Sequence, residues 1–177
     1  MTTGAGGHGH WVHRFHTGDA SAAAAGIVDI DRGQSRPARI LGWLLRLPPA
    51  ATGQSARLRI VREARGSVTH ERWIRAFGTV TLATRQVRRG RRVGERAGPV
   101  ELRMRYRMTE SGIWYIPDGA AVILGRFSFP LPALVAPQAR AHAWPSGDSA
   151  FGVEVSVRVP LLGVLVSYRG HFTEAGE

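Results

Sequence analysis

The feature that most constrains this chain is a repeated alternation of apolar and polar residues. The clearest stretch runs from Val100 to Met108, where valine, leucine, methionine and tyrosine alternate with glutamate and arginine. Side chains of a β-strand point alternately to the two faces of a sheet, so this pattern predicts a strand with one buried face. The same alternation occurs at 57–62, 80–85, 153–159 and 164–169.

Glycine or proline punctuates the junctions between these stretches, as at Gly78 and Gly90. No segment of helical length separates them, whereas parallel strands need crossovers of a dozen or more residues. We therefore expect a mainly β fold, with an antiparallel curved sheet of about eight strands closing into a barrel or half-barrel. Three prolines within 128–138 predict a rim loop or crossover there, because proline cannot donate to a sheet ladder.

One segment, 35–47, has the pattern of a short amphipathic helix. Ser35 is a suitable N-cap, Pro37 suits the first turn, and the leucines and Ile40 form an apolar stripe. Pro48 follows directly and disfavours a helical conformation in the residue before it. We expect this helix to pack on the barrel or to fill one end of it.

The remaining organisation is simple. Residues 1–10 lack apolar periodicity and are predicted to be a disordered lead-in, followed by a single β-rich domain over 11–174. No secretory signal is evident, and the best apolar run, Ile40 to Leu47, is far shorter than the roughly 20 residues that span a bilayer. We therefore expect a cytoplasmic protein without a membrane span.

The positive charge has a compositional explanation. All 24 basic residues are arginine, the net charge is +11, and lysine and asparagine are absent, as GC-rich codon usage would produce. The basic patch from Arg85 to Arg107 has no aromatic residue before Tyr106, so no base-stacking platform is evident. We interpret it as a solvated face. A patch for anionic membranes and a nucleic-acid site are the alternatives, and nucleic acid is the less favoured partner.

Several motifs occur in a characteristic order. They are Arg14–Gly18, Glu71–Gly78, Glu95–Pro99, Pro130–Pro137 and Pro160–Gly170. The ordered set resembles an uncharacterised bacterial family, domain of unknown function 4166, over nearly the whole chain. Members of that family occur alone or behind saccharopine-dehydrogenase-like or epimerase-like reductase domains. The resemblance implies a possible reductase partner and supplies no activity.

The second motif places four informative residues on one face of a strand: Glu71, Trp73, Arg75 and Phe77. Glu71 and Arg75 lie about 13 Å apart along a strand, so each needs a partner on another strand if that face is buried. The candidate partners are Glu95, Arg96, Tyr168 and Arg169. One interpretation is a structural ion pair beside an aromatic core. The other is a ligand site in which Arg75 binds a carboxylate or phosphate and Trp73 forms a wall.

The predicted ligand-binding residues are Trp73, Arg75, Phe77, Tyr168 and Arg169. A catalytic role is a weaker alternative, with Glu71 and His16 as candidate acid/base groups. His16 ends a cluster with His8, His10 and His13, whose spacing suits a metal on a helix but lacks nearby carboxylates other than Asp19. We expect no metal and no cofactor.

These observations favour a non-catalytic module that binds a small carboxylate or lipid-like ligand, or that serves a reductase as an accessory domain. An enzyme on the same scaffold, with Glu71 as the acid/base, is the first alternative. A basic protein that binds an anionic surface or nucleic acid is the second.

Overall fold

The computed structural model describes residues 10–175, which form eleven strands and two helices. The helices are α1 (His10–Thr17) and α2 (Arg36–Leu44). The strands are β1 (Ala22–Arg32), β2 (Ala51–Arg65), β3 (Val68–Phe77), β4 (Val80–Arg89), β5 (Arg92–Ala97), β6 (Val100–Thr109), β7 (Gly112–Leu124), β8 (Phe127–Pro130), β9 (Gln138–Pro145), β10 (Ala150–Val159) and β11 (Gly163–Glu174).

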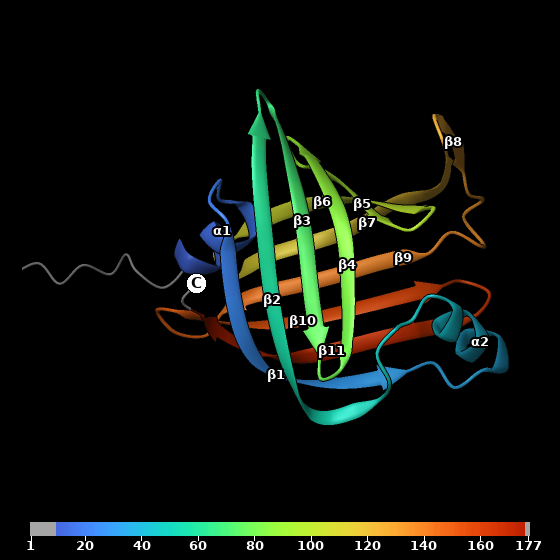
Figure 1. Cartoon of the computed structure of the whole chain (residues 1–177), viewed down its shortest axis with the longest axis horizontal. Helices are drawn as coiled ribbons and strands as arrows, with labels where there is room; N and C mark the ends of the chain where they lie inside the picture. Colours follow the sequence, from blue (N-terminus) through green and yellow to red (C-terminus); the bar gives the residue numbers. More distant parts are fainter. Residues whose placement is uncertain (1–9, 176–177) are drawn as a thin grey trace, which may run out of the picture.

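Ten of these strands form one closed antiparallel barrel. They pair in the order β6-β5-β4-β3-β2-β1-β11-β10-β9-β7, and the pairing of β6 with β7 closes the ring. β8 pairs only with the far end of β7 and protrudes from the barrel (Figure 1). The predicted barrel is confirmed, with more strands than the expected number of about eight.

The additional strands are those whose sequences lack clear alternation. β1 and β9 are rich in alanine, and β7 contains Pro117 and Gly119. β8 occupies the start of the predicted rim loop, and residues 131–137 form the irregular connection to β9. Alanine is small enough to face either side of a sheet, so binary patterning underestimates such strands.

Tight turns and bulges give the sheet its curvature. Gly66, Gly78, Gly90 and Gly98 occupy the turns between β2 and β6, each with a φ between 56° and 61° that other residues adopt only at a cost. Bulges interrupt the register between Val28 and Ile30 and on two other strand pairs. Bulges bend and twist a strand. The strands β2–β4 consequently cross the strands β9–β11 steeply (Figure 1).

The helix predicted over 35–47 is present in a shorter form. The Ser35 side chain accepts a hydrogen bond from the Ala38 amide as the N-cap, and the helix ends at Leu44. Arg46 has a φ of 51°, which ends the helical path before Pro48. α2 packs outside the barrel, where Ala38 contacts a small cluster with Val159 and Leu165.

The other helix, α1, was not predicted and closes one end of the barrel. Trp11, Val12 and Phe15 are buried there against Phe151 and the rest of the main core. Of the lead-in predicted to be disordered, residues 1–9 lie outside the described part, and His10 begins α1. Between residues 10 and 175, no helix is long and apolar enough to cross a membrane.

Candidate functional site

The predicted face of β3 points into the barrel. Glu71, Trp73 and Phe77 are each at most 5% exposed, and the Arg75 side chain is 14% exposed. Their neighbours His70 and Arg72 face solvent, as the alternation of a strand requires. The barrel interior therefore contains two charged groups from one strand, and each has a separate set of partners.

Two hydrogen-bond donors and a further guanidinium surround the Glu71 carboxylate inside the barrel. Arg62 Nε on β2 donates to Oε1 at 3.0 Å, and Trp73 Nε1 donates to Oε2 at 2.7 Å. Arg88 Nη2 on β4 lies 3.7 Å from the same carboxylate. Arg62 also donates to the backbone carbonyls of Phe15 and Ala20. The Glu71 carboxylate thus organises the contact between the barrel wall and the segment that closes it.

Arg75 belongs to a second polar group, one layer further from α1. Its Nη1 lies 2.8 Å from Glu95 Oε1 and donates to Thr84 Oγ1 at 2.8 Å. Thr84 and Gln86 both donate to the Glu95 carboxylate. Burial lowers the pKa of Arg75, but the attraction of Glu95 outweighs it, so the net shift is upward and the guanidinium stays charged. It lies 4.8 Å from the centroid of the Trp73 ring.

The structure brings Tyr168 to this group and leaves Arg169 out of it. Tyr168 on β11 packs against Phe77, with ring centroids 5.2 Å apart, and burial raises its pKa despite the nearby Arg75. Arg169, the next residue, faces outward and lies over the Trp144 ring at 5.7 Å. Adjacent residues of a strand face opposite sides, so only one of the two can share the interior with Arg75.

His16 lies at the centre of the closed end. It is 6% exposed, and neither ring nitrogen has a hydrogen-bond partner among the described residues. The rings of Phe15, Trp73, Tyr115 and Phe151 surround it at centroid distances of 5.4–5.9 Å. Burial, and then the charges of Arg62 and Arg75, lower the pKa of His16 to about 3, so its imidazole is neutral at physiological pH.

On the side of Arg75 away from α1, the side chains that face the barrel interior are apolar. Side chains of β4, β6 and β10 that pack against the core there are only partly buried: Leu82, Leu102, Val155 and Val157. The inward positions of β9 are Ala139, Ala141 and Ala143, which extend little into the barrel. This end of the interior combines small and apolar side chains with one charged pair.

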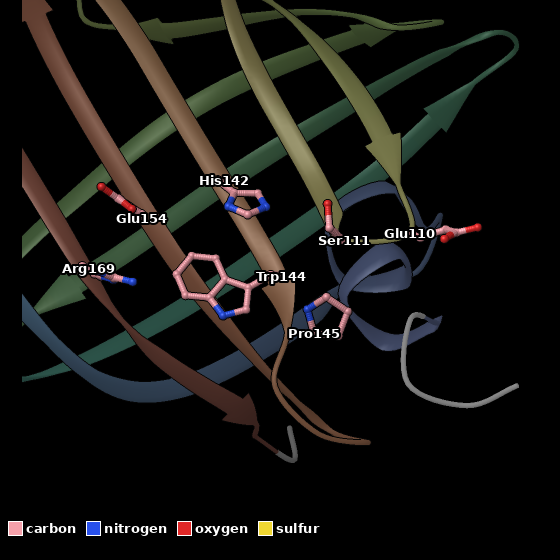
Figure 2. Close-up of a pocket in the computed structure, with 7 residues that line it drawn as sticks. All are labelled: Glu110, Ser111, His142, Trp144, Pro145, Glu154 and Arg169. Atoms are coloured by element: carbon pink, nitrogen blue, oxygen red, sulfur yellow. The ribbon is translucent and has the colours of Figure 1, made fainter. Parts of the chain in front are cut away.

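A separate cleft of about 630 Å³ lies on the outer surface, near the end closed by α1 (Figure 2). Its lining is Glu110, Ser111, His142, Trp144, Pro145, Glu154 and Arg169. The Trp144 indole covers Gly152, where an added Cβ would lie 2.2 Å from the ring. His142 stacks on Trp114 with centroids 3.6 Å apart, and burial lowers its pKa. The sequence predicted only Arg169 among these residues.

The basic segment Arg85–Arg107 divides between the two sides of the sheet. Arg88 points inward to Glu71, while Arg103 pairs with Glu101 and Arg105 pairs with Asp118 at the surface. The turn around Gly90 is exposed, as expected for a hairpin. Three of the nine arginines of this segment are therefore engaged by carboxylates.

Several interior residues had no distinct signal in the sequence: Arg62, Thr84, Arg88 and Tyr115. For α1 a signal did exist, because Trp11/Phe15 and Val12/His16 are pairs four residues apart that share one helical face. Within residues 10–175, no group of three or more histidine, aspartate or glutamate side chains could hold a metal ion.

Comparisons with known proteins agree with this fold. A protein of unknown function from the DUF3598 family of Nostoc punctiforme has a similar solved structure, with a TM-score of 0.50 and 12% sequence identity. The similarity covers 87% of this chain but only 47% of that one, so the chain spans about half of that structure's length. No curated protein matches the sequence. The sequence model of one family, described as a domain of unknown function (DUF4166), matches residues 10–172, and the chain therefore belongs to that family.

Proposed function

We propose that this protein is a non-catalytic binding module whose barrel interior takes up a small ligand with an apolar body and a carboxylate. The observation that carries the proposal is His16, a buried side chain whose two nitrogens have no partner among the described residues. A buried polar group without a hydrogen bond costs about 1–3 kcal/mol, so such groups in folded proteins usually have a partner. A ligand atom beside His16 would supply one.

The charges around His16 favour an acidic ligand group. The two interior polar groups together contain three arginines and two glutamates: Arg62, Arg75, Arg88, Glu71 and Glu95. His16 contributes no positive charge, because its pKa is lowered to about 3. Asp19 lies 4.0 Å from Arg88 but is at the surface. A carboxylate near Arg75 and His16 would gain a charged partner and a hydrogen-bond donor in a low-dielectric setting.

The rest of the interior suits an apolar body. A ten-stranded barrel is wider than the eight-stranded barrels whose interiors side chains just fill. The alanines of β9 fill little of that width. Partly exposed Leu82, Leu102 and Val155 form an apolar lining on the side away from α1. Ligand sites are mostly apolar with a few placed polar groups, which is the composition found here.

The contacts of Glu71 favour a structural role over acid/base chemistry. Both carboxylate oxygens accept hydrogen bonds, and the side chain is 2% exposed. A general acid or base must reach the proton that it transfers. Association with a reductase remains an implication of the family resemblance, to be tested by co-purification from cells.

Calorimetric titration with dodecanoate and with dodecanol tests the proposal, because the two probes share a chain and differ in charge. We expect dodecanoate to bind at least about tenfold more tightly, as one charge-assisted hydrogen bond would give. The double variant Arg75→Met/Glu95→Gln removes the ion pair without leaving an unpaired charge and should abolish the preference. Arg72→Gln, outside on the same strand, is the matched control.

Two outcomes would contradict the proposal. One is binding of neither probe by the folded wild-type protein. The other is a preference for dodecanoate that persists in the double variant, which would place the anion at an outer arginine.

A further inference from the structure

The end of the barrel opposite α1 carries an unusual number of exposed apolar side chains, and we propose that it docks onto an anionic lipid surface. We call this surface the apolar rim and define it as residues 35–47, 124–137 and 158–164. These segments include α2, the β7–β8 hairpin with its connection to β9, and the β10–β11 turn.

Exposure of large apolar residues is concentrated in the rim. Ten of the fifteen such residues in the described part of the chain lie in these three segments: Ile40, Trp43, Leu45, Leu124, Phe127, Phe129, Leu134, Val135, Leu161 and Val164. Trp43 is 77% exposed, more than any other residue of this group. Single exposed apolar residues are normal on a protein surface, but a concentration of this kind marks an interaction site.

The three segments adjoin one another in space. Ser35 Oγ donates to the Leu162 carbonyl, which joins the start of α2 to the β10–β11 turn. Gln138 pairs with Arg158, which places the connection after β8 beside the end of β10. α2 and β8 both lie at the end of the barrel away from α1 (Figure 1). The β10–β11 turn thus lies between α2 and the connection after β8, and the exposed residues follow this end of the barrel.

The charge of the rim identifies the kind of partner. The three segments contain five arginines (Arg36, Arg39, Arg46, Arg126 and Arg158) and no aspartate or glutamate. The Arg126 guanidinium lies 5.2 Å from the Phe127 ring centroid, so a cation and an apolar group share one position. Arginines interleaved with tryptophan, phenylalanine and leucine are typical of surfaces that insert apolar groups between anionic lipid headgroups.

This charge also argues against a second copy of the chain as the occupant. A symmetric dimer through the rim would bring five arginines of each copy together without a carboxylate from the same segments. An anionic lipid surface supplies the opposite charge and a place for the apolar groups.

Vesicle co-sedimentation tests the proposal with phosphatidylcholine alone and with an equal mixture of phosphatidylcholine and phosphatidylglycerol. We expect the wild-type protein to bind the mixed vesicles and not the neutral ones. Trp43→Ser/Phe127→Ser should weaken binding at least about tenfold, and Arg39→Gln/Arg126→Gln should do the same. These side chains are exposed, so the fold should tolerate the changes.

Matched controls lie elsewhere on the barrel. Val61→Ser/Ile116→Ser removes exposed apolar groups outside the rim, and Arg89→Gln/Arg91→Gln removes two arginines from the β4–β5 hairpin. Both control variants should bind mixed vesicles like the wild type. Equal losses in rim and control variants would show non-specific attraction of a basic protein and overturn the proposal, as would no binding at all.

Sedimentation velocity tests the remaining alternative, in which a second copy of the chain covers the rim. A wild-type dimer that becomes monomeric in Trp43→Ser/Phe127→Ser would assign the rim to self-association instead. The docking proposal is independent of the interior ligand: Arg75→Met/Glu95→Gln should bind vesicles like the wild type even if it has lost dodecanoate.

Discussion

Arg62 connects the buried carboxylate of Glu71 to the segment that closes the barrel. Its Nε donates to Glu71, while its terminal nitrogens donate to the carbonyls of Phe15 and Ala20. The Arg62 side chain is completely buried, and Glu71 is 2% exposed. The fit of α1 in the barrel therefore depends on an ion pair within the wall.

Replacing Glu71 by glutamine should strongly destabilise the protein. The change removes the negative charge opposite Arg62 and leaves a buried guanidinium without its counter-ion, which costs about 3–5 kcal/mol in other buried pairs. Urea unfolding followed by circular dichroism measures the difference. Glu63→Gln breaks an exposed pair with Arg65 and should change the free energy of unfolding by at most about 1 kcal/mol. Similar losses in the two variants would contradict the structural role of Glu71.

His16→Phe should raise the free energy of unfolding and weaken binding of the proposed ligand. Phenylalanine fits an environment made of Phe15, Trp73 and Phe151 and removes two buried nitrogens without partners. We expect a gain of about 1–3 kcal/mol in the free energy of unfolding at pH 7. Dodecanoate titration of the same variant should show weaker binding. A gain in stability with unchanged binding would place the ligand away from His16.

His16→Phe should also make the free energy of unfolding less sensitive to acidic pH. The pKa of His16 has its ordinary value of 6.5 in the unfolded chain and is about 3 in the folded protein. Between these two pH values the unfolded chain therefore binds more protons than the folded protein. The free energy of unfolding of the wild type should therefore fall as the pH falls, by up to about 1.4 kcal/mol per pH unit from this group alone. Urea titrations from pH 7 to pH 4 measure the slope, with His70→Gln at an exposed position as control. Parallel curves for wild type and His16→Phe would refute this source of acid sensitivity.

The barrel was predictable from sequence because its strands bury only one face. Alternation identified β6 and stretches of β2, β4, β10 and β11, and cap and proline signals identified α2. α1 was missed because it is short and follows a glycine-rich stretch, although Trp11 and Phe15 have helical spacing. A short isolated helix is marginal in water, so its formation depends on the barrel end that it fills.

The inward face of β3 was predictable from the sequence, and of its charged cross-strand partners only Glu95 was among the expected ones. The alternation of side chains along a strand places Glu71, Trp73 and Arg75 on one face. The sequence around Arg62 or Arg88, however, does not distinguish either residue from the other arginines. Arg88 belongs to an arginine-rich hairpin interpreted as a solvated face, yet it points inward. Cross-strand partners depend on register, which turns and bulges set jointly across the sheet.

The outer cleft depends on a glycine beneath an indole, and that contact can be tested directly. Gly152→Ala would place a methyl group 2.2 Å from the Trp144 ring, so the indole must move off the strand. We expect a loss of about 1–3 kcal/mol in stability, as for other overpacked sites. A shift of the Trp144 resonance in fluorine NMR of 5-fluorotryptophan-labelled protein should accompany the loss, with Trp144→Phe assigning the signal.

Gly94→Ala is the matched control for the added methyl group. At that position a Cβ would meet its nearest neighbour, the Glu101 side chain, at an ordinary 3.6 Å. Replacing glycine by alanine where the backbone tolerates it stabilises a protein by about 0.4–1 kcal/mol, so this variant should be neutral or slightly more stable. If Gly152→Ala behaved in the same way and left the Trp144 resonance in place, the indole would not rest on Gly152 in solution. The lining of the cleft would then differ from the arrangement in Figure 2.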